Sequence, residues 1–233
     1  MPGKNVIAAG HPVTVQAGQE MLWLGGNAFD AAVAAVFASI VAEPTLTSAG
    51  GGGYLMAAPR GKDPVLFDFF VDMPSGKPDP DTDFAPVEVD FGTARQEFHA
   101  GMGAVAVPGN IAGLLTVHEV LGSLDLKEVL APAARAARDG VRLNRQQAYL
   151  IRILSPILAR TPAGQGIFLD REKGGIPVEE GFVLTFPEFA DFLETLSREG
   201  QDLFYRGEVA DRLDATRRLV VPPKAVITPA VRD

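Results

Sequence analysis

The stretch TLTSAGGGGYLMAA, residues 45–58, places four consecutive glycines, Gly50 to Gly53, between a helix-like and a strand-like segment. A dinucleotide-binding loop needs the opposite order, with the strand before the glycines and the helix after them. A Walker loop needs a Lys–Ser/Thr pair after the glycines, and Tyr54-Leu55 stands there instead. The run therefore predicts a helix-to-strand turn at which backbone segments pack closely, and not a phosphate site. A further interpretation is that the glycines let a strand approach a pocket lined by another segment.

Upstream of the glycines, the sequence predicts a short strand that ends at Gly10 and then two helices. Gly25-Gly26 ends the first helix, and Asn27 is a suitable N-cap for the second. The second helix, residues 28–42, is apolar on all sides, which is typical of a helix buried all round.

Downstream, residues 53–59 and 64–74 predict a β-hairpin, because two apolar runs flank the turn RGKD. Residues 75–98, rich in proline and acidic side chains, are interpreted as a loop, and residues 104–110 as another buried strand. The remainder of the chain is interpreted as mostly helical. Helices are expected at 111–122, 126–140, 144–160 (broken by Pro156), 186–200 and 208–216, with a loop at 161–181 and a turn at 201–207.

The order of helices, then strands, then helices predicts an α+β layered domain with a buried sheet. We expect residues 1–233 to form a single domain, because 233 residues with 47% hydrophobic side chains can bury a large core. The formal net charge is -8 and the basic residues form no dense block, so nucleic-acid binding is not expected.

The composition also limits the chemistry and the location. The chain has no cysteine, which excludes disulfides, thiolate metal sites and cysteine nucleophiles. No apolar run approaches the roughly 20 residues of a membrane span. The N-terminus lacks the apolar region of a signal peptide, so a cytoplasmic location is expected, or a periplasmic or secreted one if a leader has been removed.

Residues with catalytic potential form no convincing set. His11, His99 and His118 lack the spacing of a metal site, and no G-x-S-x-G elbow is present. Thr116 is two residues from His118 on an expected helix, and residues so spaced do not face each other. Asp68 stands inside an apolar strand, where we expect it to accept hydrogen bonds from loop amides. No metal or cofactor is expected.

Three segments, in order, resemble the gamma-glutamyltransferase family (glutathione hydrolases). Residues 10–56 are similar to its N-terminal signature, with His-Pro, G-G-N-A-x-D-A-A-V-A, E-P and a glycine run. Residues 103–144 are similar to its V-P-G-x-x-x-G segment and the helices after it, and residues 200–213 to its G-x-x-F-Y-x-G-x-x-A segment.

This resemblance implies an N-terminal nucleophile hydrolase, a four-layer αββα sandwich whose precursor cuts itself before a threonine. The new N-terminal threonine would be the nucleophile, with its own amine as the base, and no cofactor is needed. The family's cleavage motif is not found in residues 1–233, so we expect this chain to be a large-subunit portion that holds no catalytic residue and is inactive alone. Its expected partners are the small subunit, from the C-terminal half of the same precursor, and a small amide or peptide substrate. Apolar surface left uncovered could also form a homo-oligomer.

One departure from the family concerns its R-E-x-A-P element, whose arginine grips the substrate carboxylate. In the matching stretch FDFFVDMP, Phe70 stands at the arginine position, and Asp72 and Pro74 lie near the acidic and proline positions. We expect weak use of γ-glutamyl compounds and a preference for a less polar acyl group, unless Arg95 in the following loop restores the charge. Two alternatives are a side-chain amidase like the cephalosporin (glutaryl) acylases and an inactive scaffold or binding module.

Overall fold

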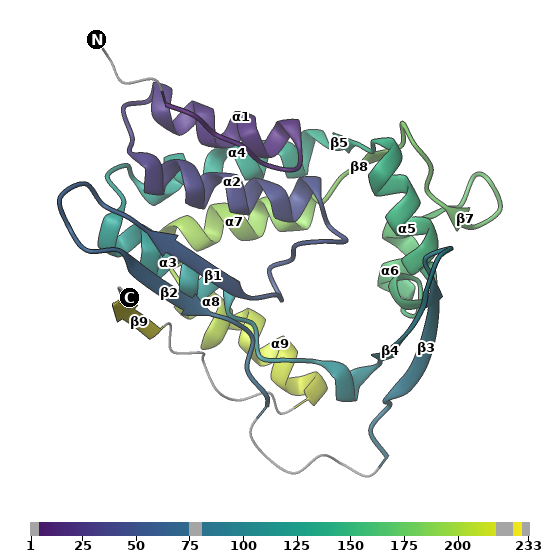
Figure 1. The fold of residues 1–233 in the computed structure, drawn as a ribbon. Helices are drawn as coiled ribbons and strands as arrows, with labels where there is room; N and C mark the ends of the chain where they lie inside the picture. Colours follow the sequence, from purple (N-terminus) through teal and green to yellow (C-terminus); the bar gives the residue numbers. More distant parts are fainter. Residues whose placement is uncertain (1–4, 75–80, 218–225, 230–233) are drawn as a thin grey trace. The chain divides into compact units, whose positions relative to one another are not determined.

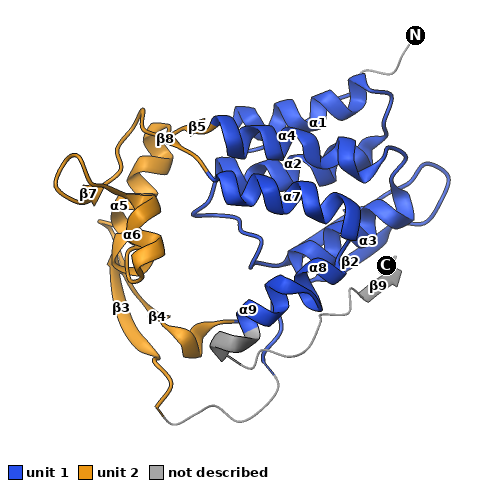
Figure 2. Cartoon of the chain, turned by 180° about the vertical axis from the view of Figure 1, so that it is seen from behind, with its two compact units in different colours: residues 1–75, 106–139, 186–233 blue, residues 76–105, 140–185 orange. Residues whose placement is uncertain are grey.

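The computed structural model describes residues 5–74, 81–217 and 226–229, and its helices and strands form an α+β fold as predicted (Figure 1). The chain divides into two compact units (Figure 2). Unit 1 contains Met1–Ser75, Ala106–Asp139 and Phe186–Asp233, and unit 2 contains Gly76–Val105 and Gly140–Thr185. The organisation of residues 1–233 as one domain stays a prediction.

Unit 1 combines a small antiparallel sheet with a group of helices. The sheet has the order β1-β2-β9, and α3 packs against β2. The strands are β1 (Gly53–Ala57), β2 (Val65–Phe69) and β9 (Val226–Pro229). The helices are α1 (Pro12–Trp23), α2 (Ala28–Ala42), α3 (Asn110–Leu121), α4 (Leu126–Asp139), α7 (Pro187–Glu199), α8 (Asp202–Tyr205) and α9 (Glu208–Arg217).

Helix α2 begins as the sequence predicts, at an Asn27 N-cap. The Asn27 Oδ1 atom accepts hydrogen bonds from the amides of Phe29 and Asp30, and the Asp30 carboxylate accepts one from the Asn27 amide at 2.8 Å. This capping box satisfies amides that have no partner within the helix. Most of α2 is buried, and Phe37 at its centre has no exposed surface, which confirms the predicted buried helix.

The Asp30 side chain is fully buried and connects α2 to the loop between α3 and α4. It accepts hydrogen bonds from the Ser123 amide at 2.9 Å, the Ser123 hydroxyl at 2.6 Å and the Leu124 amide at 3.3 Å. Burial raises the pKa of the Asp30 carboxyl, but the hydrogen bonds from Ser123, Asn27 and Leu124 outweigh this effect and hold the pKa below its usual value. A single carboxylate thus joins the start of α2 to the loop between α3 and α4.

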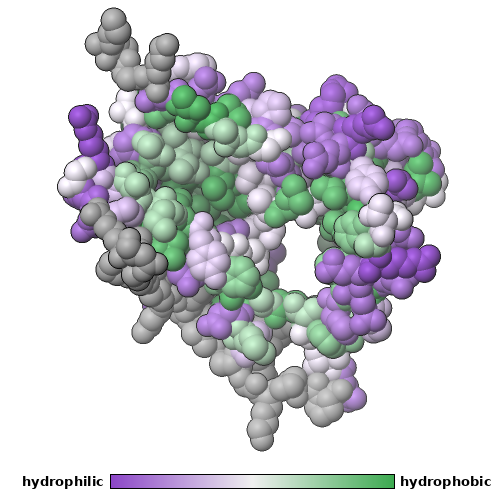
Figure 3. Space-filling model, viewed as in Figure 1, coloured by the Kyte–Doolittle hydropathy of each residue, from purple (hydrophilic) through white to green (hydrophobic). Residues whose placement is uncertain are grey.

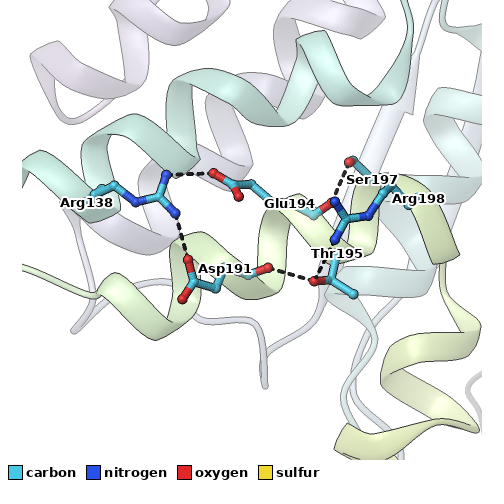
Figure 4. A network of polar contacts seen from close by, with 6 residues as sticks. All are labelled: Arg138, Asp191, Glu194, Thr195, Ser197 and Arg198. Atoms are coloured by element: carbon cyan, nitrogen blue, oxygen red, sulfur yellow. Dashed lines mark hydrogen bonds and ion pairs between the residues drawn. The ribbon is translucent and has the colours of Figure 1, made fainter.

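Helices α4 and α7 pack through small and branched side chains and are bridged at the surface. Ala133 of α4 and Ala190 and Leu193 of α7 have no exposed surface. The Arg138 guanidinium donates to Glu194 at 2.6 Å and to Asp191 at 2.7 Å (Figure 4). Because this network is exposed, it adds little to stability.

Two segments of unit 1 differ from the prediction. Residues 5–10 form no strand, and Val6 is 88% exposed with no strand beside it among the described residues. Residues 104–110 are not a buried strand either. Val107 forms a single bridge to Asp72, and the next residue, Pro108, has no amide hydrogen with which to extend a ladder. The chain then turns directly into α3.

Unit 2 consists of a hairpin, two helices and short strand pairs. The hairpin is β3 (Ala85–Asp90) with β4 (Arg95–Ala100), followed by the 3-10 turn η1 (Met102–Ala104). The other elements are β5 (Val141–Arg142), paired with β8 (Val183–Leu184), α5 (Arg145–Leu158), α6 (Pro162–Phe168), and β6 (Leu169–Asp170), paired with β7 (Ile176–Pro177).

Three predictions for unit 2 are wrong. The expected loop at 75–98 contains β3 and the start of β4; residues 75–80 lie outside the described residues. The expected loop at 161–181 contains α6, which begins with a Thr161 N-cap. Pro156 does not break α5, which continues to Leu158, because the Ser155 hydroxyl donates at 2.9 Å to the Arg152 carbonyl, the acceptor that the proline leaves without an amide.

We expect Asp30→Asn to destabilise the protein by about 1.5–3 kcal/mol at neutral pH, since hydrogen bonds to a charged acceptor are lost. The folded pKa is lowered, so the carboxylate stabilises the fold above the unfolded pKa near ~3.9, and this contribution is lost as the pH falls through the folded pKa. The difference between wild type and variant in urea unfolding should therefore shrink on acidification. Asp139→Asn, at the exposed end of α4, is the control, and a difference independent of pH would contradict the role of the charge.

Candidate functional site

The glycine run lies directly against the backbone of residues 69–71. A Cβ atom at Gly52 would lie 2.5 Å from the Val71 nitrogen and 2.6 Å from the Phe69 carbonyl oxygen. The run does not use the left-handed backbone conformation, because none of its glycines has a positive φ. The predicted close approach of two backbones is therefore confirmed, and it is the absence of a side chain that the turn needs.

Two glycines at the start of α3, Gly109 and Gly113, also lie directly against Phe69. A Cβ atom at Gly109 would overlap the Phe69 carbonyl, and one at Gly113 would overlap the Phe69 ring. The Phe69 side chain is accordingly buried. Two glycine motifs that are more than fifty residues apart in the sequence thus hold one phenylalanine.

The start of α3 is also bonded to the glycine run. The Gly51 carbonyl accepts the amides of Gly109 and Asn110, both at 2.9 Å, and the Asn110 side-chain amide donates to the Ser48 carbonyl at 2.7 Å. We call residues 108–113 the α3 hub.

Tyr205 of α8 completes the hub. Its hydroxyl donates to the Pro108 carbonyl at 2.9 Å and accepts the Ala112 amide at 3.2 Å. Burial raises the pKa of Tyr205 to about 12, although the hydrogen bond from Ala112 opposes this shift. Each of the three segments used for the sequence resemblance therefore contributes contacts to one small region of unit 1.

Phe70 follows the buried Phe69 and points away from the core. The residue is 54% exposed, and its ring stacks on Tyr54, with centroids 5.5 Å apart and planes at 11°. The Phe70 amide donates to the Asp68 carboxylate at 3.0 Å, which confirms that Asp68 binds a loop amide. Asp72 is exposed, and its carboxylate accepts the Met73 amide at 2.7 Å. The structure thus brings Phe70 and Asp72 together on one short segment.

Arg95 lies in unit 2 and was expected in a loop, but it is the first residue of β4. Its guanidinium pairs with Asp90 and with Glu88, both at 3.3 Å, on an exposed surface. Arg95 and Asp90 form the pair next to the turn between β3 and β4, and Glu88 lies two residues before Asp90 on the same strand. The charge of Arg95 is therefore already compensated within unit 2.

The histidines have structural contacts. His11 caps α1 by accepting the Val13 amide at 3.2 Å, and burial lowers its pKa despite the nearby Glu43 carboxylate. His118 lies 2.8 Å from the Leu124 carbonyl. Within the described ranges, no cluster of three potential metal ligands occurs, and no helix is long and apolar enough to cross a membrane.

A pocket of about 350 Å³ lies beside the glycine run in unit 1, and residues from α2, α3 and β1 line it. Tyr54 lines this pocket and also stacks on Phe70. Sequence reasoning missed Tyr54, although the hairpin register could have indicated it. Tyr54 pairs with Asp68 and lies on the same face of the sheet. Phe70 follows Asp68 by two residues, so it is the diagonal neighbour of Tyr54 across the hairpin.

The family comparison supports this architecture. The gamma-glutamyltranspeptidase family model matches residues 14–218. A "Glutathione hydrolase proenzyme" of Bacillus subtilis (strain 168) is 32% identical over 217 residues, which are 92% of this chain and 36% of the relative. The "Acylase ACY 1 proenzyme" of Pseudomonas sp. (strain V22) is 32% identical over 214 residues, 90% of this chain and 38% of the relative.

Among solved structures, Helicobacter pylori gamma-glutamyltranspeptidase superposes with a TM-score of 0.75 at 25% identity, covering 92% of this chain and 61% of that one. The fold is thus that of the N-terminal nucleophile hydrolases of this type. The chain belongs to the gamma-glutamyltranspeptidase family and corresponds to its large-subunit region. It spans little more than a third of the length of these two curated relatives.

We expect Gly52→Ala to destabilise the fold by about 1–3 kcal/mol, because a methyl group there must displace the backbone of residues 69–71. Gly50→Ala is a matched control in the same run, since a Cβ atom there meets nothing nearer than the Ser48 hydroxyl at 3.7 Å. Chemical denaturation of both variants measures the difference. Equal stabilities would show that the close approach is not required.

Tyr205 should ionise late in an alkaline titration, because burial raises its pKa to about 12. Because its folded pKa is raised, the neutral phenol stabilises the fold below the unfolded pKa, and this stability is lost as the pH rises from ~10 toward ~12. An alkaline absorbance titration should show a late step that Tyr205→Phe abolishes. Tyr149→Phe, at a half-exposed tyrosine, should leave the late step intact, and a variant of Tyr205 that retains it would contradict the assignment.

Proposed function

We propose that this chain is the large-subunit portion of a gamma-glutamyltranspeptidase-like amidohydrolase or acyltransferase. Family membership, the fold and relatives described as proenzymes support this proposal. The small subunit, from the remainder of the same precursor, would supply an N-terminal threonine as nucleophile. That threonine would attack the substrate amide carbonyl to form an acyl-enzyme, the amine would leave, and water or an amino acid would take the acyl group.

The role of this chain in the proposed reaction is to shape the acyl site. The observation that carries this proposal is the position of Phe70, which the α3 hub holds at the end of β2 with its ring exposed. A family arginine at this position would bind a substrate carboxylate through two parallel hydrogen bonds. Phenylalanine removes that clamp, at a cost of about 2 kcal/mol or more for a γ-glutamyl group, and offers an apolar wall.

The charge around Phe70 also disfavours a carboxylate. Asp68 and Asp72 lie on either side of it, and neither forms an ion pair among the described residues. Arg95, the other candidate for binding a carboxylate, is paired with two acidic residues within unit 2. We therefore propose an acyl group that is less polar than γ-glutamyl.

A side-chain amidase is the second candidate function. The "Acylase ACY 1 proenzyme" of Pseudomonas sp. (strain V22), as similar as the glutathione hydrolase relative, favours it. Both candidates share the threonine chemistry and differ in the acyl group.

The test compares hydrolysis of γ-glutamyl-p-nitroanilide with that of apolar acyl anilides by the full-length protein. Wild type should favour the apolar substrates, and Phe70→Arg should raise kcat/KM for the γ-glutamyl substrate by about 10-fold or more, because it restores a bidentate carboxylate clamp. Phe70→Lys is the control and should restore less, since an ammonium group is a point charge. Fast γ-glutamyl turnover by wild type would refute the specificity proposal.

Self-processing is followed on a denaturing gel in the same experiment. Two bands from one precursor are expected. A precursor that stays intact and turns over none of the substrates would indicate an inactive scaffold or binding module instead.

A further inference from the structure

The outer face of the β1–β2 hairpin carries exposed apolar and aromatic residues. Tyr54 and Met56 of β1 are 59% and 58% exposed, and Phe70 extends the same face beyond β2. In Figure 3, apolar residues gather over the part of unit 1 that contains α2 and this hairpin. Single exposed apolar residues are ordinary, but a stacked pair of rings beside a pocket is a feature that requires an explanation.

We infer that Tyr54 is a second specificity-determining residue, which forms with Phe70 an aromatic wall that binds a neutral, planar aryl-acyl group. This inference rests on the proposed function, because it concerns the acyl site of that reaction. It adds the chemical class of the acyl group and a residue, Tyr54, that the sequence comparison with the family did not indicate.

The geometry of the two rings supports a flat wall. Their planes are nearly parallel, at 11°, and their centroids are 5.5 Å apart, which is an offset stack. Both residues are more than half exposed in this chain, which leaves ring surface for a ligand. A planar aromatic group can continue such a stack, whereas a flexible alkyl chain gains only apolar contact.

The backbone, and not neighbouring side chains, sets the position of the wall. Tyr54 pairs with Asp68 in the β1–β2 ladder, so the register places Tyr54 diagonally across from Phe70, on the same face of the sheet. Gly52 lies against the backbone of Phe70, and the Phe70 amide is bonded to Asp68. A wall fixed in this way loses little conformational entropy when a ligand binds, which favours affinity.

The acidic side chains near Phe70 disfavour a negatively charged acyl group. The carboxylates of Asp68 and Asp72 lie on the segment that carries Phe70, and they disfavour an acyl group that ends in a carboxylate. Tyr54 also lines the pocket of about 350 Å³, whose other lining residues include Val36, Leu55 and Leu114. That volume lies within the range of small-molecule sites. Of the two rings of the wall, only that of Tyr54 belongs to a residue that lines this pocket.

The experiment measures kcat/KM of the full-length processed protein for three p-nitroanilides: phenylacetyl, hexanoyl and γ-glutamyl. Wild type should prefer phenylacetyl. Tyr54→Ala should lower kcat/KM for the phenylacetyl substrate by about 5- to 10-fold, as expected for the loss of one aromatic stacking partner, and change the hexanoyl value less than about 2-fold. Tyr54→Phe should retain the preference, since the ring and not the hydroxyl forms the wall.

Met56→Ala is the matched control, because Met56 is on the same strand and face and is equally exposed but does not stack on Phe70. It should leave the substrate ranking unchanged. A Tyr54→Ala variant that lowers all three values alike, or none, would overturn the inference while the proposed function stands.

Failure of the proposed function would look different, because wild type would release nitroaniline from none of the substrates. Saturation-transfer NMR of phenylacetamide with the full-length protein then tests the wall without turnover. Binding to wild type and Tyr54→Phe, with loss in Tyr54→Ala, would support the aryl site. Equal saturation transfer in wild type and Tyr54→Ala, or none in wild type, would refute it.

Discussion

The close approach of glycine backbones to Phe69 is the constraint on which much of unit 1 depends. Gly52 lies against residues 69–71, and Gly109 and Gly113 lie against the Phe69 carbonyl and ring. No side chain larger than hydrogen fits at these three positions without a shift, so the sheet and the start of α3 can meet only where the chain has glycine. The buried Asp30 carboxylate has a comparable role at the other end of α3.

The same constraint separates the packed scaffold of unit 1 from the site that we propose for the acyl group. The α3 hub fixes the backbone up to Phe69, and the next side chain, Phe70, lies outside the packed region and is exposed. A substitution at position 70 therefore changes the chemistry of the proposed acyl site with little effect on packing. The glycine motifs are structural, while Phe70 and its neighbour Tyr54 are the residues that we propose select the acyl group.

Local signals predicted the parts of the fold that depend on local physics. Asn27 marked the start of α2, and the glycine run was correctly interpreted as a close backbone approach. The errors arose where the outcome depends on a particular partner, whether remote or local, that composition does not reveal. Residues 5–10 have strand composition without a neighbouring strand, and Pro156 is accommodated because the Ser155 hydroxyl takes over the bond to a carbonyl. For the site, the sequence analysis indicated Phe70 and Asp72 but missed Tyr54, whose ring reaches Phe70 across the hairpin and which only an explicit strand register would have indicated.

The sequence by itself determined the family, the α+β class, the helices on either side of Gly25 and the hairpin that carries Phe70, because motif order, capping residues and apolar periodicity are local properties of the chain. Only the tertiary structure decided that the glycine run, the Gly109 segment and Tyr205 meet at the α3 hub, and that Tyr54 stacks on Phe70. Such contacts join residues far apart in the chain. Their existence depends on which backbones can approach one another, and packing in three dimensions sets that limit.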